Sequence, residues 1–514
     1  MTASDLAGRP GATGRAGPEL DERRTGSAPG DADGAGGRAA WLMLGVLLLG
    51  QFMAALDVYV VNVALPSISG GLHASGGSLQ LVAGAYSIAY ATVLVTGARL
   101  GALRGRRRTY LAGLAGFTIG SLLCGLAPDT VALIAARAVQ GAAAAIMVPQ
   151  IISVIQTRFA GPARARALSA YTVVLSAGGV AGLMAGGVLV SANLFGSAWR
   201  PVFLVNVPIG IVLLALVPRL VPADRPQPDR KLDLAGLGVL APAMVLTVVP
   251  LVLGHEAGWP AWTFAALAAG LVLAWLFVLL QRRIAARGGD PLMNLDVLRA
   301  PGFAAGLGTL VCQMVNYGGL LFSFTLYLQS GLGDGPLRAG LTWLPMAVLF
   351  GLASFFWRAL PERWHPLLPP IGLGVCALGN LGLAAALSGG GQDGALMWVA
   401  LAGWGAGAGI GLSLLTHSLV HVPARRVADA SGLLTTTLQF GQVLGVAAFG
   451  SVYLALAERA DDRSPVRVTL AAGHAIAVTN RWLALADLVG VAAGLVLARA
   501  VAAAGRETRA AAAH

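Results

Sequence analysis

The stretch WLMLGVLLLGQFMAALDVYVVNVALP, residues 41–66, is long enough to cross a bilayer and contains one charged side chain, Asp57. A membrane-spanning helix needs about 20 apolar residues, and a carboxylate in hydrocarbon costs on the order of 3 kcal/mol. Such an acid usually faces a polar cavity, pairs with a cation or takes up a proton. The stretch therefore indicates a membrane protein that uses Asp57.

The composition extends this conclusion to the whole chain. Of 514 residues, 56% are hydrophobic and 11% are charged, with a mean hydropathy of +0.74, whereas soluble domains have roughly 25% charged residues. The chain is thus predicted to be an all-α polytopic membrane protein. We predict fourteen spans, at residues 40–64, 79–98, 109–127, 130–154, 167–190, 200–218, 234–254, 261–281, 303–327, 338–357, 367–387, 395–417, 430–454 and 480–500.

The basic residues predict the orientation. Alternate loops place all but seven of the 35 Lys and Arg on one side. The exceptions are Arg137 within a span and, on predicted outer loops, Arg200, Arg338, Arg459, Arg463, Arg467 and Arg481. Basic residues collect on the cytoplasmic side, so both termini are predicted to be cytoplasmic. The net charge of +12 then reflects topology, and we expect no nucleic-acid partner.

Two further features are negative. Residues 1–39 have almost no large apolar side chain and are predicted to be a disordered cytoplasmic tail, and the apolar run from Trp41 is too long for a cleavable signal. Cys124, Cys312 and Cys376 all fall inside spans, far apart in sequence, where they behave as small apolar residues. We expect no disulfide, metal or cofactor.

Several local sequences resemble one family. They are LDVYVVNVALP at 56–66, RAVQG at 137–141 followed by an Ala-rich run, WRPVFLVNVPIG at 199–210, PLMNLDVL at 291–298, YLQ at 327–329 with AGLTWLP at 339–345, and ASGLL at 430–434. Together they resemble the fourteen-helix drug:proton antiporter branch of the major facilitator superfamily, over residues 40–500.

The resemblance implies the major facilitator fold, with two six-helix bundles that rock around a site at the bilayer midplane. The implied domains are an N-terminal bundle at 40–221, a linker with two inserted helices at 222–300, a C-terminal bundle at 301–503 and a cytoplasmic tail at 504–514. The inserted spans have Thr247 as nearly their only polar side chain before Gln281. This composition suits a lipid-exposed position outside the transport path.

Depth in the membrane pairs the two buried charges. Asp57 lies nine residues before Pro66, and Arg137 lies eight residues after Asp129, which gives depths of about 13 Å and about 12 Å at a rise of ~1.5 Å per residue. The resemblance implies that the first and fourth helices both line the central cavity. We therefore predict a contact between Asp57 and Arg137, with Gln140 on the same face.

Two interpretations of this pair stand side by side. Asp57 could exchange a proton as Arg137, water and substrate rearrange, or the two side chains could form a permanent ion pair that fixes helix packing. Asp487 is the only other acid well inside a span. Because Arg481 is six residues away, we expect Asp487 to find a local partner or to reach the outer surface, with proton coupling as the alternative.

Residues 97–108, GARLGALRGRRR, resemble the gating motif of the superfamily through Arg99, Gly105 and Arg106. Ala102 stands where the family pattern has an acid, and Leu103 where it often has a basic residue. In the family, that acid is thought to stabilise the outward-facing state by contacting a neighbouring helix end. The departures put this contact in doubt. Retention of the loop by anionic lipid explains the basic cluster equally well.

The stretch GGVAGLMAGG, residues 178–187, resembles the antiporter motif. Gly178, Gly182 and Gly186 fall on one helical face, which allows another helix to pack closely. Leu183 replaces the proline that the family has after the middle glycine. This weakens the motif as evidence for antiport, and close packing is its simpler role.

Candidate substrate contacts are polar or aromatic residues at helical spacing. Interhelical hydrogen bonds or ordinary packing are the alternatives for each of them. The candidates are Tyr59, Asn62, Tyr86, Tyr90, Gln140, Gln313, Asn316, Tyr317, Trp343 and Gln439.

An enzyme is not expected, because the chain has no metal-binding cluster, no phosphate-binding loop and no soluble domain. The prediction is a proton-coupled efflux transporter for hydrophobic or amphipathic small molecules such as drugs and antibiotics. It would work as a monomer in a bacterial plasma membrane, with the lipid bilayer, the substrate and protons as partners. A metabolite symporter or uniporter and a non-transporting scaffold are the alternatives, and the charge of the substrate stays open.

Overall fold

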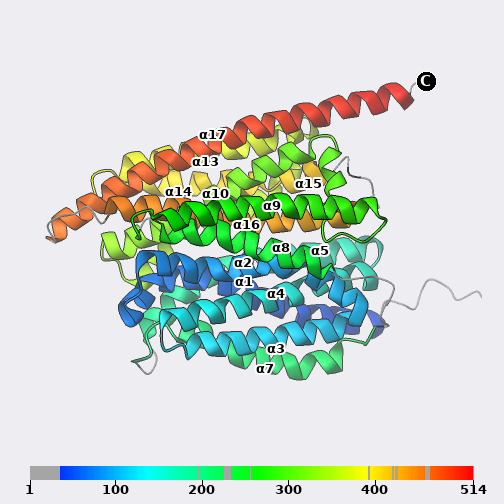
Figure 1. Cartoon of the computed structure of the whole chain (residues 1–514), viewed down its shortest axis with the longest axis horizontal. Coiled ribbons are helices and arrows are strands. Elements are labelled where there is room, and N and C mark those ends of the chain that lie inside the picture. Colours follow the sequence, from blue (N-terminus) through cyan, green and yellow to red (C-terminus); the bar gives the residue numbers. More distant parts are fainter. Residues whose placement is uncertain are drawn as a thin grey trace, which may run out of the picture.

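The structure is a computed structural model that describes residues 35–193, 196–224, 233–254, 256–391, 394–419, 422, 426–457 and 464–512. These described residues contain helices, turns and short connections but no strand, which confirms the predicted all-α class. The long helices run roughly side by side (Figure 1). Most of the predicted tail 1–39 lies outside the described residues, although α1 already begins at Ala35.

The first bundle packs α2 and α3 onto α4, α1 onto α5, and α3 onto α7. Small residues allow this closeness, since a Cβ on Gly97 or Gly141 would collide with the backbone of the neighbouring helix. Asp129 caps α4, where its Oδ1 accepts from the N–H of Ala132 at 2.8 Å. The helices are α1 (Ala35–Leu72), α2 (Gly76–Arg104), α3 (Arg106–Gly125), α4 (Thr130–Arg158), α5 (Gly161–Ala192), α6 (Pro201–Leu204) and α7 (Asn206–Leu220).

The second bundle packs α10 onto α16 and α17, and α13 onto α14 and α17. Its last helix continues past residue 503, so the predicted tail 504–514 is helical up to Ala512. The α-helices are α10 (Phe303–Leu326), α11 (Pro336–Thr342), α12 (Leu344–Phe356), α13 (Leu368–Leu387), α14 (Ala395–Gly411), α15 (Leu414–Leu419), α16 (Val427–Ala457) and α17 (Pro465–Ala512). Short 3-10 or π turns are η2 (Leu295–Arg299), η3 (Tyr327–Gly331), η4 (Trp357–Ala359) and η5 (Glu362–Leu367).

Two green helices, α8 (Leu234–Leu253) and α9 (Ala261–Ala286), run along the front of the molecule in Figure 1, near the line where the first and second bundles meet. Along α9, Leu271 and Trp275 are 67% and 60% exposed, as expected for a helix that faces lipid. In contrast, α8 contacts both α2 and α16, and Val248 on it is buried. The prediction of a lipid-exposed inserted pair therefore fits α9 but is incomplete for α8.

Twelve helices in the described part of the chain are long and apolar enough to cross a membrane. The other two predicted spans, 109–127 and 395–417, correspond to α3 and α14. Three arginines at the start of α3 lower its hydropathy, and α14 is an apolar helix of 17 residues that ends at Gly411. The fourteen-span count is thus not reached by length and composition alone.

The two bundles are in contact at the end of the molecule where α11 begins, which we call the Pro336 end. There Gly187 of α5 packs against Leu337, and Gln329 donates from Nε2 to the carbonyl of Val63 at 2.9 Å. The opposite end, where α2 finishes, is called the Arg104 end. Helix α2 also approaches α16 along its length, with Gly76 beside Leu454 and Val95 beside Gly432.

Candidate functional site

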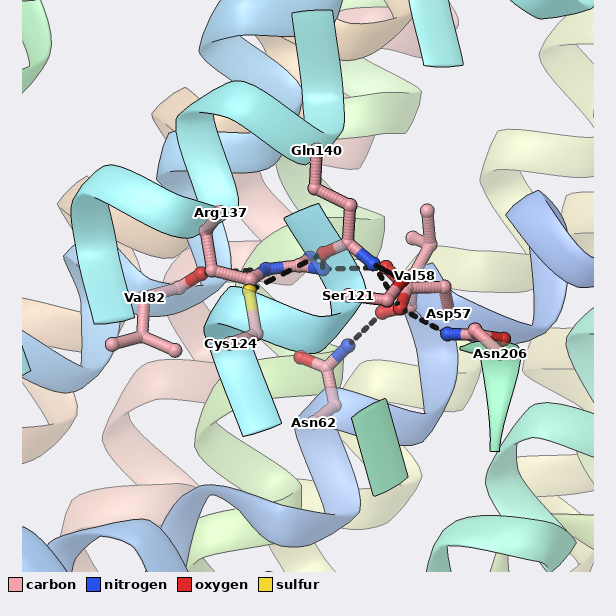
Figure 2. A network of polar contacts seen from close by, with 9 residues as sticks. All are labelled: Asp57, Val58, Asn62, Val82, Ser121, Cys124, Arg137, Gln140 and Asn206. Atoms are coloured by element: carbon pink, nitrogen blue, oxygen red, sulfur yellow. Dashed lines mark hydrogen bonds and ion pairs between the residues drawn. The ribbon is translucent and has the colours of Figure 1, made fainter. Parts of the chain in front are cut away.

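Asp57 lies in the middle of α1 and is completely buried. Its Oδ2 accepts from Nη1 of Arg137 on α4 at 2.5 Å. Its Oδ1 accepts from Nε2 of Gln140 at 2.8 Å and from Nδ2 of Asn206 on α7 at 2.9 Å (Figure 2). The predicted contact between Asp57 and Arg137 is confirmed, and Gln140 joins it as the helical spacing suggested.

Arg137 has further partners besides the carboxylate. Its Nη1 also donates to Oε1 of Gln140 at 2.6 Å, and its Nε donates to the carbonyl of Val82 at 3.4 Å. The guanidinium carbon lies 4.6 Å from the ring centroid of Tyr86, within the range of a cation–π interaction. Only 1% of Arg137 is exposed. The guanidinium therefore has neutral partners that would remain if Asp57 lost its charge.

Sequence reasoning missed two members of this cluster. Asn206 donates to Asp57, and Ser121 on α3 accepts from Nε2 of Gln140 at 2.8 Å. Asn206 lies inside the quoted motif at 199–210, and an asparagine in an apolar span was the available signal. Ser121 carries no such signal, because serine is common in membrane helices. Helices α1, α3, α4 and α7 together form the site.

Four of the predicted aromatic contacts form two ring pairs. Tyr86 stacks on Tyr90 in α2 with a centroid distance of 6.1 Å. Tyr59 meets Tyr317 edge to face at 6.3 Å, across the boundary between the first and second bundles. Tyr317 also stacks on Trp404 of α14 at 5.8 Å. These rings connect the Asp57 region with the second bundle.

The other predicted contact residues do not join these pairs. Asn62 donates to the carbonyl of Val58, and Gln313 donates to the carbonyl of Ala408, both at 2.9 Å. Trp343 is buried and packs against Phe324 at 5.2 Å, and Gln439 is half-buried on α16. Asn62 is thus bonded within α1, Gln313 joins α10 to α14, and Trp343 is held by packing in this conformation.

At the Arg104 end, Arg99 contacts the backbone after α9. Its guanidinium donates to the carbonyls of Asp290, Pro291 and Leu292, and it lies 3.4 Å from a carboxylate oxygen of Asp290. The acid that the family pattern places at Ala102 is absent, yet Arg99 still connects α2 to the chain that enters the second bundle. This arrangement holds the helix ends together without that acid.

Arg106 and Gly105 lie beside Asp224. The backbone N–H of Arg106 donates to Oδ2 of Asp224 at 2.9 Å, and its Nε donates to Oγ of Ser153 at 2.6 Å. Gly105 has φ +91°, in the region that favours glycine, and allows the tight connection from α2 to α3. The basic cluster is thus bonded to an acidic loop residue and not only directed to lipid.

The glycines of α5 pack against α1. A Cβ on Gly182 would lie 2.6 Å from the carbonyl oxygen of Leu56, and one on Gly186 would lie 3.0 Å from the carbonyl oxygen of Val60. The predicted smooth groove for a close helix contact is confirmed. It brings α5 directly against the helix that carries Asp57.

Asp487 differs from its prediction. Only 1% of it is exposed, and its Oδ2 accepts from Nδ2 of Asn316 at 2.7 Å and from Nδ2 of Asn380 at 2.9 Å. The expectation that it reaches the outer surface or a neighbour near Arg481 was wrong. Amides on α10 and α13, distant in sequence, bind it inside the second bundle.

The chain is similar in sequence to known transporters. The sequence profile described as Major Facilitator Superfamily matches residues 47–446. The chain is 36% identical over 481 residues to the probable actinorhodin transporter of Streptomyces coelicolor, covering 90% of this chain and 82% of that one. It is 34% identical to the cephamycin export protein CmcT of Amycolatopsis lactamdurans, covering 86% and 90%.

The fold is also similar to a solved structure. A bacterial homologue of the human lysosomal transporter Spinster, in an inward-facing and unoccupied conformation, superposes with a TM-score of 0.65. The two share 16% sequence identity over 90% of this chain and 98% of the other, so this likeness concerns the fold alone. The all-helical fold, the profile match and the transporter and export proteins among its relatives lead to one conclusion: this chain is a membrane transporter that belongs to the Major Facilitator Superfamily.

Proposed function

We propose that the protein exports amphipathic antibiotics or related small molecules in exchange for protons, with Asp57 as the proton-carrying group. One observation carries the proposal: a fully buried carboxylate lies at the junction of four helices and is paired with Arg137. Buried acids in membrane helices commonly belong to substrate or proton pathways. The name of one relative, the cephamycin export protein, supports the direction of transport.

In the cluster around Asp57, a proton can replace Arg137 as the positive partner of the carboxylate. In the described conformation the ionised Asp57 accepts from Arg137, Gln140 and Asn206. A proton on Asp57 removes its attraction for Arg137, whose guanidinium then relies on Gln140 and on the Tyr86 ring. Because α1, α4 and α7 all contribute to the cluster, this change alters how they pack.

The available driving force is sufficient for such coupling. One proton crossing the membrane gains about 2.3 kcal/mol per 100 mV of potential and about 1.4 kcal/mol per pH unit. That energy is comparable to the cost of rearranging a buried ion pair, roughly 3–5 kcal/mol. A proton gradient can therefore shift the conformational equilibrium, provided that one state binds the proton more tightly.

Aromatic side chains between the bundles suit an amphipathic substrate. Tyr59 and Tyr317 meet at the bundle boundary, and Tyr86 and Tyr90 stack beside the Asp57 cluster. Aromatic rings bind flat apolar molecules and keep a polar edge for hydrogen bonds. Proposed further contacts, for conformations in which their present bonds open, are Asn62, Gln140, Gln313, Asn316, Trp343 and Gln439.

The proposal includes the finer architecture. With α3 and α14 counted, fourteen helices cross a bacterial plasma membrane, both termini are cytoplasmic and the protein works as a monomer. Arg99, Gly105 and Arg106 then lie at the cytoplasmic gate, and Gly182 and Gly186 form the surface on which α1 moves against α5. The close contacts at the Pro336 end support a state that is closed toward the outside.

Everted membrane vesicles test the function. A proton gradient is imposed, and uptake of ethidium and of a panel of antibiotics is compared for the wild type, Asp57→Asn and Asp129→Asn. Asp129 is a matched control, because it is an acid at a helix N-cap. We expect gradient-driven uptake that is lost in Asp57→Asn and kept in Asp129→Asn. Gradient-driven uptake by Asp57→Asn at wild-type rate would refute the coupling role, and uptake that needs no gradient would indicate a uniporter.

A further inference from the structure

The second bundle contains a buried carboxyl group that forms no ion pair with any residue that the structure describes. Asp487 on α17 is 1% exposed and receives two hydrogen bonds from neutral amides, both on Oδ2. Its Oδ1 is buried and has no hydrogen-bond partner in the described residues. A carboxylate charge in an apolar interior is not balanced by two amides on one of its oxygens.

The groups that face Asp487 from the packed helices do not supply a positive charge. Cys312 on α10 and Cys376 on α13 are free thiols, and a thiol carries no positive charge in either protonation state. On its own helix, Arg481 is exposed and lies on the outer face. No ion pair with Asp487 occurs in the parts of α10, α13, α16, η3 and η5 that the structure describes. A proton is the simplest neutralising partner.

The residues around Asp487 correspond to those around Asp57, but on different helices of the bundle. In the first bundle the acid is on the first helix, and Asn206 on the last helix donates to it at 2.9 Å. In the second bundle Asn316 on the first helix donates to Asp487 on the last helix at 2.7 Å. The acid and the asparagine have exchanged helices. Each bundle therefore has a carboxyl–asparagine hydrogen bond between its first and last helices.

The fourth helix marks the chemical difference between the two sites. In the first bundle it supplies Arg137, and in the second it supplies Trp404, whose Nε1 donates to Oδ1 of Asn316 at 3.0 Å. An indole N–H is a neutral donor and cannot balance a carboxylate. On the third helix, Asn380 also has a buried Oδ1 without a donor. A proton on Oδ1 of Asp487 would turn this unpartnered acceptor into a hydroxyl donor.

We infer that Asp487 is a second proton-binding site, occupied in the described conformation, which needs no arginine. Binding of this proton stands on the geometry alone, whereas its use in transport rests on the proposed function. Asn316 is adjacent in sequence to Tyr317, which stacks on Trp404 and meets Tyr59 of the first bundle. A movement of Tyr317 or Trp404 at the bundle boundary would therefore alter the hydrogen bond from Trp404 to Asn316, and with it the bond from Asn316 to Asp487.

Infrared spectroscopy of the purified protein in lipid tests this inference without any substrate. A protonated carboxyl group absorbs through its C=O stretch, apart from ionised carboxylates. We expect such a band at neutral pH in the wild type, in Asp57→Asn and in Asp129→Asn, and its loss in Asp487→Asn. Asn380→Ala should keep the band and shift its frequency, because one hydrogen bond to the carboxyl group is removed. This second variant separates loss of the proton from loss of the fold.

Three results would overturn the inference. The band could persist in Asp487→Asn, or the folded wild type could show none at neutral pH. Thermal stabilisation by Na⁺ that disappears in Asp487→Asn, without a carboxyl band, would assign the site to a cation instead. Failure of the proposed function looks different, since it appears as gradient-independent transport while the carboxyl band is unchanged.

Discussion

The buried pair of Asp57 and Arg137 predicts that its two single substitutions destabilise the protein to different extents. Asp57→Asn leaves Arg137 charged, because arginine does not lose its proton in proteins, with only neutral partners such as Gln140 and Tyr86. Arg137→Met leaves Asp57 with two amide donors, and Asp57 can take up a proton to become neutral. The first variant therefore cannot relieve its charge, whereas the second can.

The magnitudes follow from burial of both groups, which are 0% and 1% exposed. Breaking such a pair from one side costs about 3–5 kcal/mol, and we place Asp57→Asn near the upper limit. Replacing both charges together is often nearly neutral, so the double variant should lose at most about 1–2 kcal/mol. The coupling free energy between the two sites is then at least about 3 kcal/mol.

Raising the pH should destabilise Arg137→Met more than Asp57→Asn. In Arg137→Met the folded state binds a proton on Asp57 that the unfolded state has released near neutral pH. Its free energy of unfolding then falls by up to about 1.4 kcal/mol per pH unit on this account. In Asp57→Asn this site adds no pH dependence to the free energy of unfolding.

Unfolding of the lipid-embedded protein by SDS titration, at about pH 6 and about pH 8, measures these quantities for the wild type, both single variants and the double variant. Additive effects of the two substitutions would refute the coupling of Asp57 to Arg137. Equal pH slopes in the two single variants would refute the proposed protonation of Asp57.

Two further predictions concern packing and capping. Gly182→Ala should lower the free energy of unfolding by roughly 1–3 kcal/mol, because its Cβ would lie 2.6 Å from the carbonyl oxygen of Leu56, whereas Gly374→Ala, with open space around it, should not lower it. Equal stability of these two variants in the SDS titration would contradict the packing account. Glu256→Gln should weaken the start of α2 by about 0.5–2 kcal/mol, because the carboxylate accepts from the N–H of Gly77. Faster amide exchange in the first turn of α2 checks this, and unchanged exchange would show that the bond is not formed.

The sequence predicted the helices from local information, and it predicted the main ion pair from residue counting combined with the family resemblance. Apolar length identifies a span, and counting residues from Pro66 and Asp129 placed Asp57 and Arg137 at one depth. In the structure α1 continues to Leu72, so Pro66 is not the helix end. The depth comparison succeeded because the family resemblance had already placed both helices around one cavity.

The sequence did not predict the partners that depend on helix packing. Asn380 lies more than 100 positions from Asp487, so spacing along the chain cannot indicate their hydrogen bond. The nearby Arg481 suggested a local partner, but its side chain points from another face of the same helix. Similarly, the apolar sequence of α8 gave no sign that Val248 is buried between the bundles.

Substrate-driven proton movement tests the central claim most directly. Proteoliposomes are loaded with an antibiotic that the vesicle assay has identified, without any imposed pH gradient, and internal pH is recorded as the antibiotic leaves. The account predicts that export by the wild type acidifies the interior, and that Asp57→Asn shows no acidification while Asp129→Asn behaves as the wild type. Acidification by Asp57→Asn at the wild-type rate would contradict the role of Asp57 as the coupling group.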